Sequence, residues 1–383
     1  MDLTFSQEQI LLRNSAQRYL ADHYPPLSRP PIASDQRGTR TQWREFAKLG
    51  WLGMPLPEDC GGLGQGMVEV GILMQAFGRG LVSEPYVPSV VLCAGLIAQA
   101  GSPAQRRAVL PRVVAGETRI ALAHVEDRAR FTLTHVETTA RPGAGGWVLN
   151  GRKTAVLAGA DADHFLVSAR LSGATRDPSG IGLFLLPRGT DGLSIEPWAT
   201  LDGAGVAVIG LDRVAAADEN LLGGSRDAAA VLEANVDRAI CASCAELVGI
   251  MDAVLDATLA YARTRIQFGQ PLAANQVLRH RLVDMSVACE EARSMALRAA
   301  LIADTADAAA GALAASAAKV KIARSAMLVT EQAVQLHGAM GVTDELNIGA
   351  YLKRALSLGI HFGPVEHHLR RHALLSGRGR TAA

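Results

Sequence analysis

Two residue pairs in this sequence have spacings that can support redox or metal chemistry. Cys241 and Cys244 form a C-x-x-C pattern, and His368 and His372 stand one helical turn apart. A redox C-x-x-C pair belongs to a thioredoxin-like βαβ unit, and zinc needs a third ligand near the two histidines. The flanking sequence meets neither requirement, which favours two small buried cysteines and a basic terminal helix.

Glycine pattern and charge also weigh against two kinds of ligand. The glycines between Gly61 and Gly66 do not form G-x-G-x-x-G after a strand, so we infer no Rossmann site. The chain carries 38 Lys and Arg residues against 37 Asp and Glu residues. No excess charge is therefore available to attract a nucleic acid or an anionic membrane.

The composition is typical of a globular protein in a reducing compartment. Five cysteines scattered over 383 residues do not form a disulfide framework. The N-terminus lacks the basic and apolar stretches of a signal peptide, and the apolar runs fall short of the roughly 18 residues that a membrane span needs. We expect a cytoplasmic protein with two or three compact units.

The order of patterns along the chain is helical, then β, then helical. Residues 1–118 carry helical periodicity, with Ser6 as the expected N-cap of the first helix and a further helical pattern over 82–100. Residues 119–225 carry short apolar or alternating runs between Gly, Pro and Asp, which predicts a small sheet or barrel of about five to eight strands. No helical pattern separates these runs, so a doubly wound sheet is not expected.

Residues 226–383 return to helical periodicity. Apolar residues keep an i, i+3/i+4 rhythm from Val236 to Thr258. Further long helices are expected at 272–303, 306–338 and 345–358. The fold class is therefore an α+β multidomain chain divided at 1–118, 119–225 and 226–383.

Five segments, in this order and in these regions, resemble the acyl-CoA dehydrogenase family over essentially the whole chain. They are W-x-x-F-A-K-L-G-W-L-G from Trp43, P-E-D-C-G-G-L-G from Pro57, L-N-G-R-K from Leu149, Y-A-R-T-R-I-Q-F-G-Q-P-L from Tyr261 and Q-L-H-G-A-M-G-V-T-D-E from Gln335. The resemblance implies a helical domain, a middle β domain and a C-terminal four-helix bundle, assembled as a tetramer or dimer of dimers. It also implies FAD bound between the β domain of one subunit and the bundle of its neighbour.

The resemblance assigns cofactor-binding residues in the C-terminal domain. Arg265 and Phe268 match an R-x-x-F-G element that contacts the neighbour's FAD, and Gln335, Gly338 and Gly341 match a Q-x-x-G-G-x-G element near the pyrophosphate. An arginine fork suits phosphate oxygens, and glycine lets backbone N–H groups approach a phosphate closely. The second glycine of that element is alanine here. The alternative for these residues is an ordinary helix end and C-cap.

The catalytic base of the family has no obvious counterpart. Members carry a glutamate shortly before the last helix, where desolvation brings its pKa toward the working range; Phe362 occupies that place here. Other members carry the base near the start of the first C-terminal helix, where Asp237 is the best candidate, followed by Glu246 and Glu233. The alternative for all three is a solvated or ion-paired helix carboxylate.

The β domain also departs from the family pattern. The usual A-x-T-E-P-x-x-G-S-D stretch is replaced from Ala123 to Arg128 by A-H-V-E-D-R, and no aromatic residue follows Lys153 where a tryptophan packs beside the flavin in relatives. The β-domain residues that would bind this subunit's own flavin thus differ from the family pattern. The C-terminal residues that would contact a neighbour's flavin match it. No metal site is expected.

This asymmetry resembles the small subunit of pimeloyl-CoA-type or steroid-acyl-CoA-type heteromeric dehydrogenases. The expected function is α,β-dehydrogenation of an acyl-CoA thioester with hydride transfer to FAD. An electron-transfer flavoprotein or similar acceptor is the expected redox partner. Two alternatives stay open. One is a self-sufficient homotetramer that uses Asp237 or Glu246, and the other is a non-catalytic assembly subunit that completes a paralogous partner's FAD site.

Overall fold

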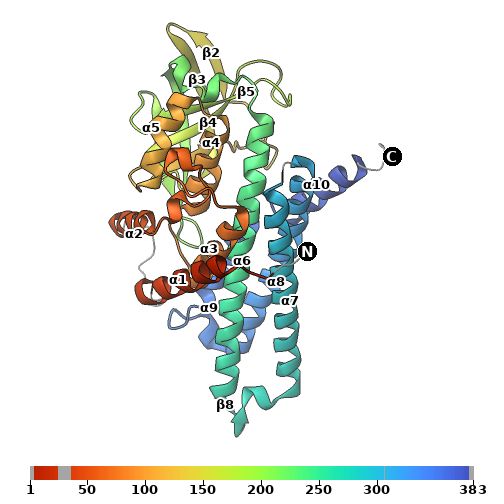
Figure 1. The fold of residues 1–383 in the computed structure, drawn as a ribbon. Coiled ribbons are helices and arrows are strands. Elements are labelled where there is room, and N and C mark those ends of the chain that lie inside the picture. The colour runs from red at the N-terminus through yellow and green to blue at the C-terminus, as the bar shows by residue number, and fades with distance from the viewer. Residues whose placement is uncertain (1–3, 25–35, 306, 379–383) are drawn as a thin grey trace. The chain divides into compact units, whose positions relative to one another are not determined.

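The computed structural model describes residues 4–24, 36–305 and 307–378, and its close contacts group the chain into two compact units (Figure 1). The helical unit consists of Met1–Pro30, Gly66–Val82 and Ile240–Ala383, and the sheet unit consists of Pro31–Gln65 and Ser83–Ala239. Helical ends around a central sheet confirm the expected fold class. The three-domain division at residues 118 and 225 stays a prediction.

The sheet unit is built on one curled, seven-stranded sheet, within the expected range of strand number. Its strand order is β1-β4-β2-β3-β7-β6, with β5 paired to β4; β1 and β2 run parallel to β4 and the other pairs are antiparallel. The strands are β1 Ile120–Ala123, β2 Thr139–Gly143, β3 Gly146–Leu157, β4 His164–Arg170, β5 Ile181–Pro187, β6 Leu193–Trp198 and β7 Val206–Ala216.

The core of the sheet unit follows from the apolar runs in these strands. Strands β4 and β5 are buried along almost their whole length, and aromatic rings such as Phe165, Phe184 and Trp147 fill the interior. Strand β6 lies at the sheet edge and is mostly exposed. Strand burial of this kind is what continuous, rather than alternating, hydrophobic sequence predicts.

Short helices complete the sheet unit. They are α2 Gln36–Lys48, η2 Trp51–Gly53, η3 Glu58–Cys60, η4 Tyr86–Ala94, α4 Gly95–Ala100, α5 Pro103–Val114, η5 Asp218–Asn220 and η6 Leu222–Gly224. Within the expected 82–100 helix, Tyr86–Ala94 is a π-helix that continues into α4. Pro88 lies in the first turn, where a helix tolerates proline because the N–H groups there have no partner within the helix. The Ser89 hydroxyl accepts a hydrogen bond from the Ile120 N–H at 2.9 Å.

The helical unit is made of long helices. They are α1 Gln7–His23, α3 Met67–Gly80, α7 Gln276–Ala303, α8 Ala308–His337, α9 Ile348–Ile360 and α10 Val365–Arg378, with the η8 turn Gly338–Val342. Helix α6, Ala229–Thr264, begins in the sheet unit and continues through the helical unit. Helices α7 and α8 pack side by side (Figure 1). Ser6 forms the expected cap of α1, together with Gln9 in a capping box.

Helices α3 and α6 cross so closely that each needs glycine at the contact. A Cβ at Gly78 would lie 2.0 Å from the carbonyl oxygen of Glu246, and a Cβ at Gly249 would lie 1.9 Å from the carbonyl oxygen of Gln75. No side chain fits at such distances without displacing backbone. This crossing fixes the part of α6 that carries Glu246.

Substituting Gly249 with alanine is therefore expected to destabilise the chain, because the methyl group forces α3 and α6 apart. We expect a loss of about 3 kcal/mol, measured as the shift of the urea denaturation midpoint. Gly311→Ala is the matched control, since Gly311 lies in α8 with open space around its would-be Cβ. That substitution should raise stability by about 0.5–1 kcal/mol. Equal effects of the two changes would contradict the crossing.

Candidate functional site

A short hairpin follows α6 and carries the first two predicted cofactor residues. Strands β8, Ile266–Gln267, and β9, Gln270–Pro271, pair antiparallel and are joined by Phe268 and Gly269 with φ of 51° and 77°. Two successive left-handed residues are the geometry of a tight two-residue hairpin turn. Backbone bonds from Arg265 N–H to Tyr261 O and from Leu272 N–H to Arg265 O close the hairpin against the helix end, at 2.8 and 2.9 Å.

The tip of this hairpin is open to solvent. The Phe268 side chain is 100% exposed and Ile266 is 62% exposed. Among the described residues, no partner hydrogen-bonds to the exposed guanidinium of Arg265. An aromatic ring and an arginine left in water at the end of a rigid turn are available to an external ligand.

The other predicted cofactor residues lie where α8 ends. Helix α8 stops at His337, and Gly338 follows with a φ of 62°, a conformation that favours glycine. A Cβ at Gly341 would lie 2.8 Å from the carbonyl oxygen of Val334, so this position must stay small. Gln335 and Gly338 are exposed. The local geometry therefore requires both glycines.

A ring contact brings these two helix ends together. The rings of Tyr261 in α6 and His337 in α8 stack with centroids 4.3 Å apart, and the Tyr261 hydroxyl donates to the His337 carbonyl at 3.5 Å. Burial lowers the pKa of His337, which keeps the ring neutral at pH 7. Arg265 follows Tyr261 by one turn, so the hairpin and the glycine turn lie at the same end of the helical unit.

The three candidate carboxylates have different surroundings. Glu246 is buried and pairs with Arg354 at 2.7 Å, Asp237 is buried, and Glu233 is exposed. Asp237 and Glu246 stand nine residues apart on one helix, which separates them by about 13 Å along its axis. One substrate proton cannot be within reach of both, so at most one can act as its base.

Phe362, which the resemblance predicts to stand in place of the family glutamate, lies in the turn between α9 and α10. Its φ of 60° is unusual for a residue with a bulky side chain. The side chain is half-buried and meets the His361 ring edge to face at 6.3 Å. A phenyl group there cannot take up a proton.

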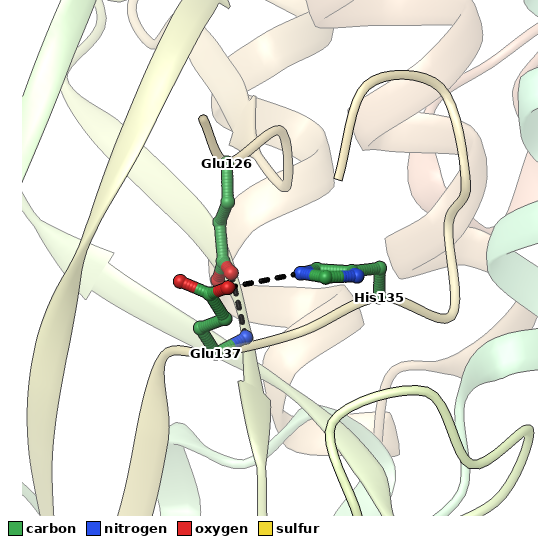
Figure 2. Close-up of side chains that lie close together, drawn as sticks. All are labelled: Glu126, His135 and Glu137. Atoms are coloured by element: carbon green, nitrogen blue, oxygen red, sulfur yellow. Dashed lines mark hydrogen bonds and ion pairs between the residues drawn. The ribbon is translucent and has the colours of Figure 1, made fainter. Parts of the chain in front are cut away.

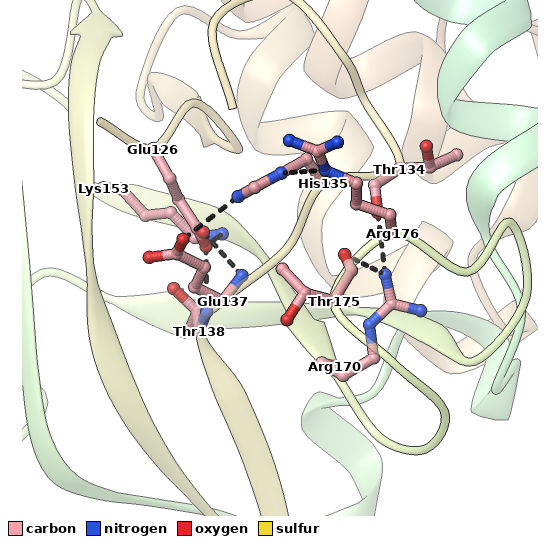
Figure 3. Close-up of polar contacts among 9 residues, drawn as sticks. All are labelled: Glu126, Thr134, His135, Glu137, Thr138, Lys153, Arg170, Thr175 and Arg176. Carbon is pink, nitrogen blue, oxygen red and sulfur yellow. Dashed lines mark hydrogen bonds and ion pairs between the residues drawn. The ribbon is translucent and has the colours of Figure 1, made fainter. Parts of the chain in front are cut away.

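The loop after β1 holds a buried ion pair that the sequence did not reveal. Lys153 in β3 is fully buried and donates to Glu126 at 2.7 Å and to Ser168 at 2.9 Å. Glu126 also accepts the backbone N–H groups of Glu137 and Thr138 at 2.6 and 3.0 Å (Figure 3). Both carboxylate oxygens of Glu126 are therefore occupied.

The pair shifts the pKa values of both partners. Burial would raise the pKa of Glu126, but the charge and hydrogen bond of Lys153 outweigh it and the pKa is lowered. Burial lowers the pKa of Lys153 to about 8, with Glu126 acting in the opposite direction. At neutral pH the two groups form a charged pair.

Glu126, His135 and Glu137 place three potential metal ligand atoms within 4.8 Å of one another (Figure 2). The His135 Nδ1 accepts from Arg176 Nε at 3.2 Å, so Nε2 carries the proton and donates to Glu137 at 3.1 Å. A metal would have to displace that proton and compete with Lys153. The cluster is thus better explained as a hydrogen-bond network than as a metal centre, and no sequence signal joins these residues across the loop.

Arg170 connects the loop after β1 with the loop between β4 and β5. Its guanidinium donates to four backbone carbonyls, those of Thr134, Thr175, Asp177 and Ser179, at 2.6 to 3.0 Å. Figure 3 shows the bonds to Thr134 and Thr175. Glu126 and Arg170 thus hydrogen-bond to backbone groups of the loop after β1 from within the sheet unit.

Strand β3 is irregular just beyond Lys153. The register with β7 shifts between Lys153 and Val156, and Ala155 and Ala158 both have positive φ. The Thr154 N–H donates to the Val125 carbonyl at 2.8 Å. Small aliphatic residues thus occupy the stretch in which the sequence lacks the expected tryptophan.

Three models of acyl-CoA dehydrogenase domains match this chain. The N-terminal domain matches residues 6–117, the middle domain residues 121–214 and the C-terminal domain residues 229–373. The chain belongs to the acyl-CoA dehydrogenase family. The resemblance stated from the five sequence segments is thereby confirmed.

Individual family members are similar over nearly the whole length. The acyl-CoA dehydrogenase fadE12 of Mycobacterium tuberculosis (strain CDC 1551 / Oshkosh) is 29% identical over 357 residues, which cover 91% of each chain. A variant of the Tcur3481-Tcur3483 steroid ACAD is 30% identical, with a TM-score of 0.86 and coverage of 98% of this chain and 99% of that one. The ChsE4-ChsE5 complex from Mycobacterium tuberculosis is 25% identical, with a TM-score of 0.87 and full coverage of both chains.

Structures of this fold include a flavin complex. The FAD complex of PigA has a TM-score of 0.89 at 23% identity and covers 98% of this chain and 99% of that one, a likeness of fold. In the described part of the dehydrogenase chain, no helix is long and apolar enough to cross a membrane.

Replacing Lys153 with methionine is expected to destabilise the chain by about 3–5 kcal/mol, because Glu126 would be left buried without its countercharge. The denaturation midpoint in urea measures the loss. The neighbouring exposed pair of Arg152 with Asp127 supplies the control, and Arg152→Met should cost less than about 0.5 kcal/mol. If both variants unfolded at the same urea concentration, the Glu126–Lys153 pair would carry no special role.

Proposed function

We propose that this chain is a subunit of an FAD-dependent acyl-CoA dehydrogenase that introduces an α,β double bond into a CoA thioester. The observation that carries the proposal is the exposed hairpin tip of Arg265 and Phe268 beside the glycine turn of Gly338 and Gly341. When bound, FAD would accept the hydride from the β-carbon of the thioester. The named residues of this chain would hold its nucleotide part.

The residue types fit a dinucleotide. The Arg265 guanidinium offers a planar fork of donors for phosphate oxygens, and Phe268 offers a ring face for stacking. At Gly338 nothing lies within 4 Å of a would-be Cβ, so a ligand can approach the backbone closely. Gln335, exposed one turn earlier, adds an amide that can donate and accept.

We propose further that the flavin held by this hairpin belongs to a partner subunit. A completely exposed Phe268 gains a binding partner only from outside its own helical unit. In the sheet unit, Glu126, Lys153 and Arg170 are engaged with one another or with backbone groups, which leaves these three charged side chains largely occupied. This favours a hetero-oligomer with a paralogous dehydrogenase, and a solved structure similar to this chain is likewise a complex, that of ChsE4 with ChsE5.

We propose that the partner subunit also supplies the base that abstracts the proton. Phe362 cannot act as a base, and the Glu246 carboxylate is already engaged in a buried ion pair with Arg354 at 2.7 Å. Asp237 is the remaining candidate within this chain for a self-sufficient enzyme. The acyl group would be of the steroid-side-chain or dicarboxylic type, and an electron-transfer flavoprotein or similar acceptor would reoxidise the flavin.

A visible absorption spectrum tests the subunit assignment. We expect the chain purified alone to lack flavin absorbance and the chain co-expressed with a paralogous dehydrogenase to be yellow and bleached by an acyl-CoA. In that complex, Arg265→Met or Phe268→Ala should lower flavin content at least tenfold, since one charge-assisted contact contributes about 1.5–3 kcal/mol. Arg263→Met, on the exposed last turn of α6, is the matched control and should leave the flavin in place.

Two other outcomes would replace this proposal. A chain that is yellow alone and whose flavin is reduced by an acyl-CoA would be a self-sufficient dehydrogenase. A complex whose flavin content ignores Arg265 and Phe268 would mean that the hairpin serves assembly without touching the cofactor.

Asp237→Asn and Glu246→Gln separate the two sources of the base. Removing a general base costs about 10²–10⁴-fold in rate, so we expect unchanged turnover of the hetero-oligomer with Asp237→Asn. Glu246→Gln should reduce stability by breaking the buried pair with Arg354, with turnover per folded enzyme unchanged. A loss above a hundredfold in either variant at full flavin content would place the base in this chain.

A further inference from the structure

The turn between α9 and α10 is supported from behind by a buried lysine. Lys319 of α8 has no exposed surface, and its ammonium donates to the backbone carbonyl of Leu358 and, at 2.9 Å, to that of His361. Carbonyls at the end of a helix lack partners within the helix. Lys319 therefore takes the place that solvent or a further helical turn would occupy.

A second support comes from His368 on α10, which is 1% exposed. Its Nε2 lies 3.1 Å from the carbonyl oxygen of Phe362, so Nε2 must carry the proton and donate. The Nδ1 atom must then accept, and the Ser316 hydroxyl lies 3.4 Å away to donate to it. Arg371 in turn donates to the Ser316 oxygen at 3.2 Å. The whole chain of bonds has one direction, and it requires a neutral imidazole.

The surroundings of His368 oppose a positive charge. Burial is the largest cause, followed by the charge of Lys319 from α8, and His367 and Arg371 of the same helix act in the same sense; together they lower the pKa of His368 to about 3. Cys244 of α6 faces Lys319, and burial keeps this thiol neutral by raising its pKa to about 11. None of these neighbours offers a negative charge to an imidazolium at neutral pH.

The turn that these groups hold is conformationally strained. Phe362 has a left-handed backbone with a φ of 60°, and Gly363 follows at 117°. A strained turn of this kind persists only where its surroundings hold it in place. Here the restraints on Leu358, His361 and Phe362 come from side chains of α8 and α10, while Phe362 itself adds little.

We propose that residues 360–364 form a proton-controlled latch, which stays closed while His368 is neutral and opens locally when this histidine is protonated. Protonation places a hydrogen on Nδ1, which removes the acceptor for Ser316 and puts a second cation beside Lys319. Release lets Phe362 leave its left-handed conformation while the rest of the helical unit stays folded. The latch acts on the one turn that carries Phe362 and needs no cofactor.

Hydrogen–deuterium exchange of the full-length chain at pH 7 and pH 5 tests the latch. The open turn exposes a histidine with an ordinary pKa of 6.5, whereas the closed turn excludes the proton. Stability of the closed form therefore falls as the pH drops below 6.5, and protection factors for peptides covering 357–368 should fall roughly 25-fold between pH 7 and pH 5. Peptides from the α3–α6 crossing should not follow.

His368→Gln retains a side-chain N–H donor for the Phe362 carbonyl but cannot become charged. In this variant the protection factors of 357–368 should change less than roughly threefold over the same pH range. His372→Gln is the matched control on the same helix, four residues on, and should keep the wild-type response. Ser316→Ala, as a second variant, should lower protection of the turn roughly fivefold at pH 7 through the lost hydrogen bond.

Two results would overturn the latch. One is an acid-induced loss of protection of residues 357–368 that persists in His368→Gln. If that variant does not fold, the corresponding result is a turn whose protection at pH 7 is unchanged by Ser316→Ala. The other is an equal loss of protection in all peptides, which would show global unfolding in place of local release.

Discussion

The free-energy cost of removing a charged side chain from water is the main constraint on the interior of this acyl-CoA dehydrogenase family member. Lys153 and Lys319 have no exposed surface, and the charge of each is stabilised by a different kind of partner. Lys153 is paired with the carboxylate of Glu126, so its burial is compensated by an opposite charge. Among the described residues, Lys319 has only backbone carbonyls as hydrogen-bond acceptors. Its positive charge helps to lower the pKa of the neighbouring His368. From this difference follow a stable loop in the sheet unit and a proton-sensitive turn in the helical unit.

The same constraint distinguishes the hairpin from the rest of the chain. Around the loop after β1, Glu126, Lys153 and Arg170 form hydrogen bonds within the sheet unit, whereas Arg265 and Phe268 stand in solvent on a tight turn. A rigid exposed turn binds at lower entropic cost than a flexible one, because its backbone is already ordered. The hairpin is thus suited to complete a site that lies outside its own unit.

The sequence predicted the helices and strands whose residue patterns are local. Helical periodicity, the cap at Ser6 and the strand runs of the sheet could all be read from neighbouring residues. The expected helix over 82–100 contains a π-helix from Tyr86 to Ala94, which helical periodicity alone does not distinguish from an α-helix. The hydrogen bond from the Ile120 N–H to the Ser89 hydroxyl joins two elements far apart in the sequence. Likewise Glu126, His135 and Glu137 are separated by loop residues without periodicity, so their proximity could not be predicted. Where long-range contacts decide the conformation, a pattern of residue types is insufficient.

The position of Glu246 shows how packing bears on chemistry in this chain. Glu246 lies in α6 at the close crossing with α3, where its backbone carbonyl faces Gly78, and its side chain is buried. A buried carboxylate at such a place would have a raised pKa if it stood alone, as a general base requires. Arg354 reaches it at 2.7 Å and supplies a positive charge instead. The burial that makes Glu246 a candidate base thus comes with an ion-pair partner, and this favours a structural role for Glu246 over a catalytic one.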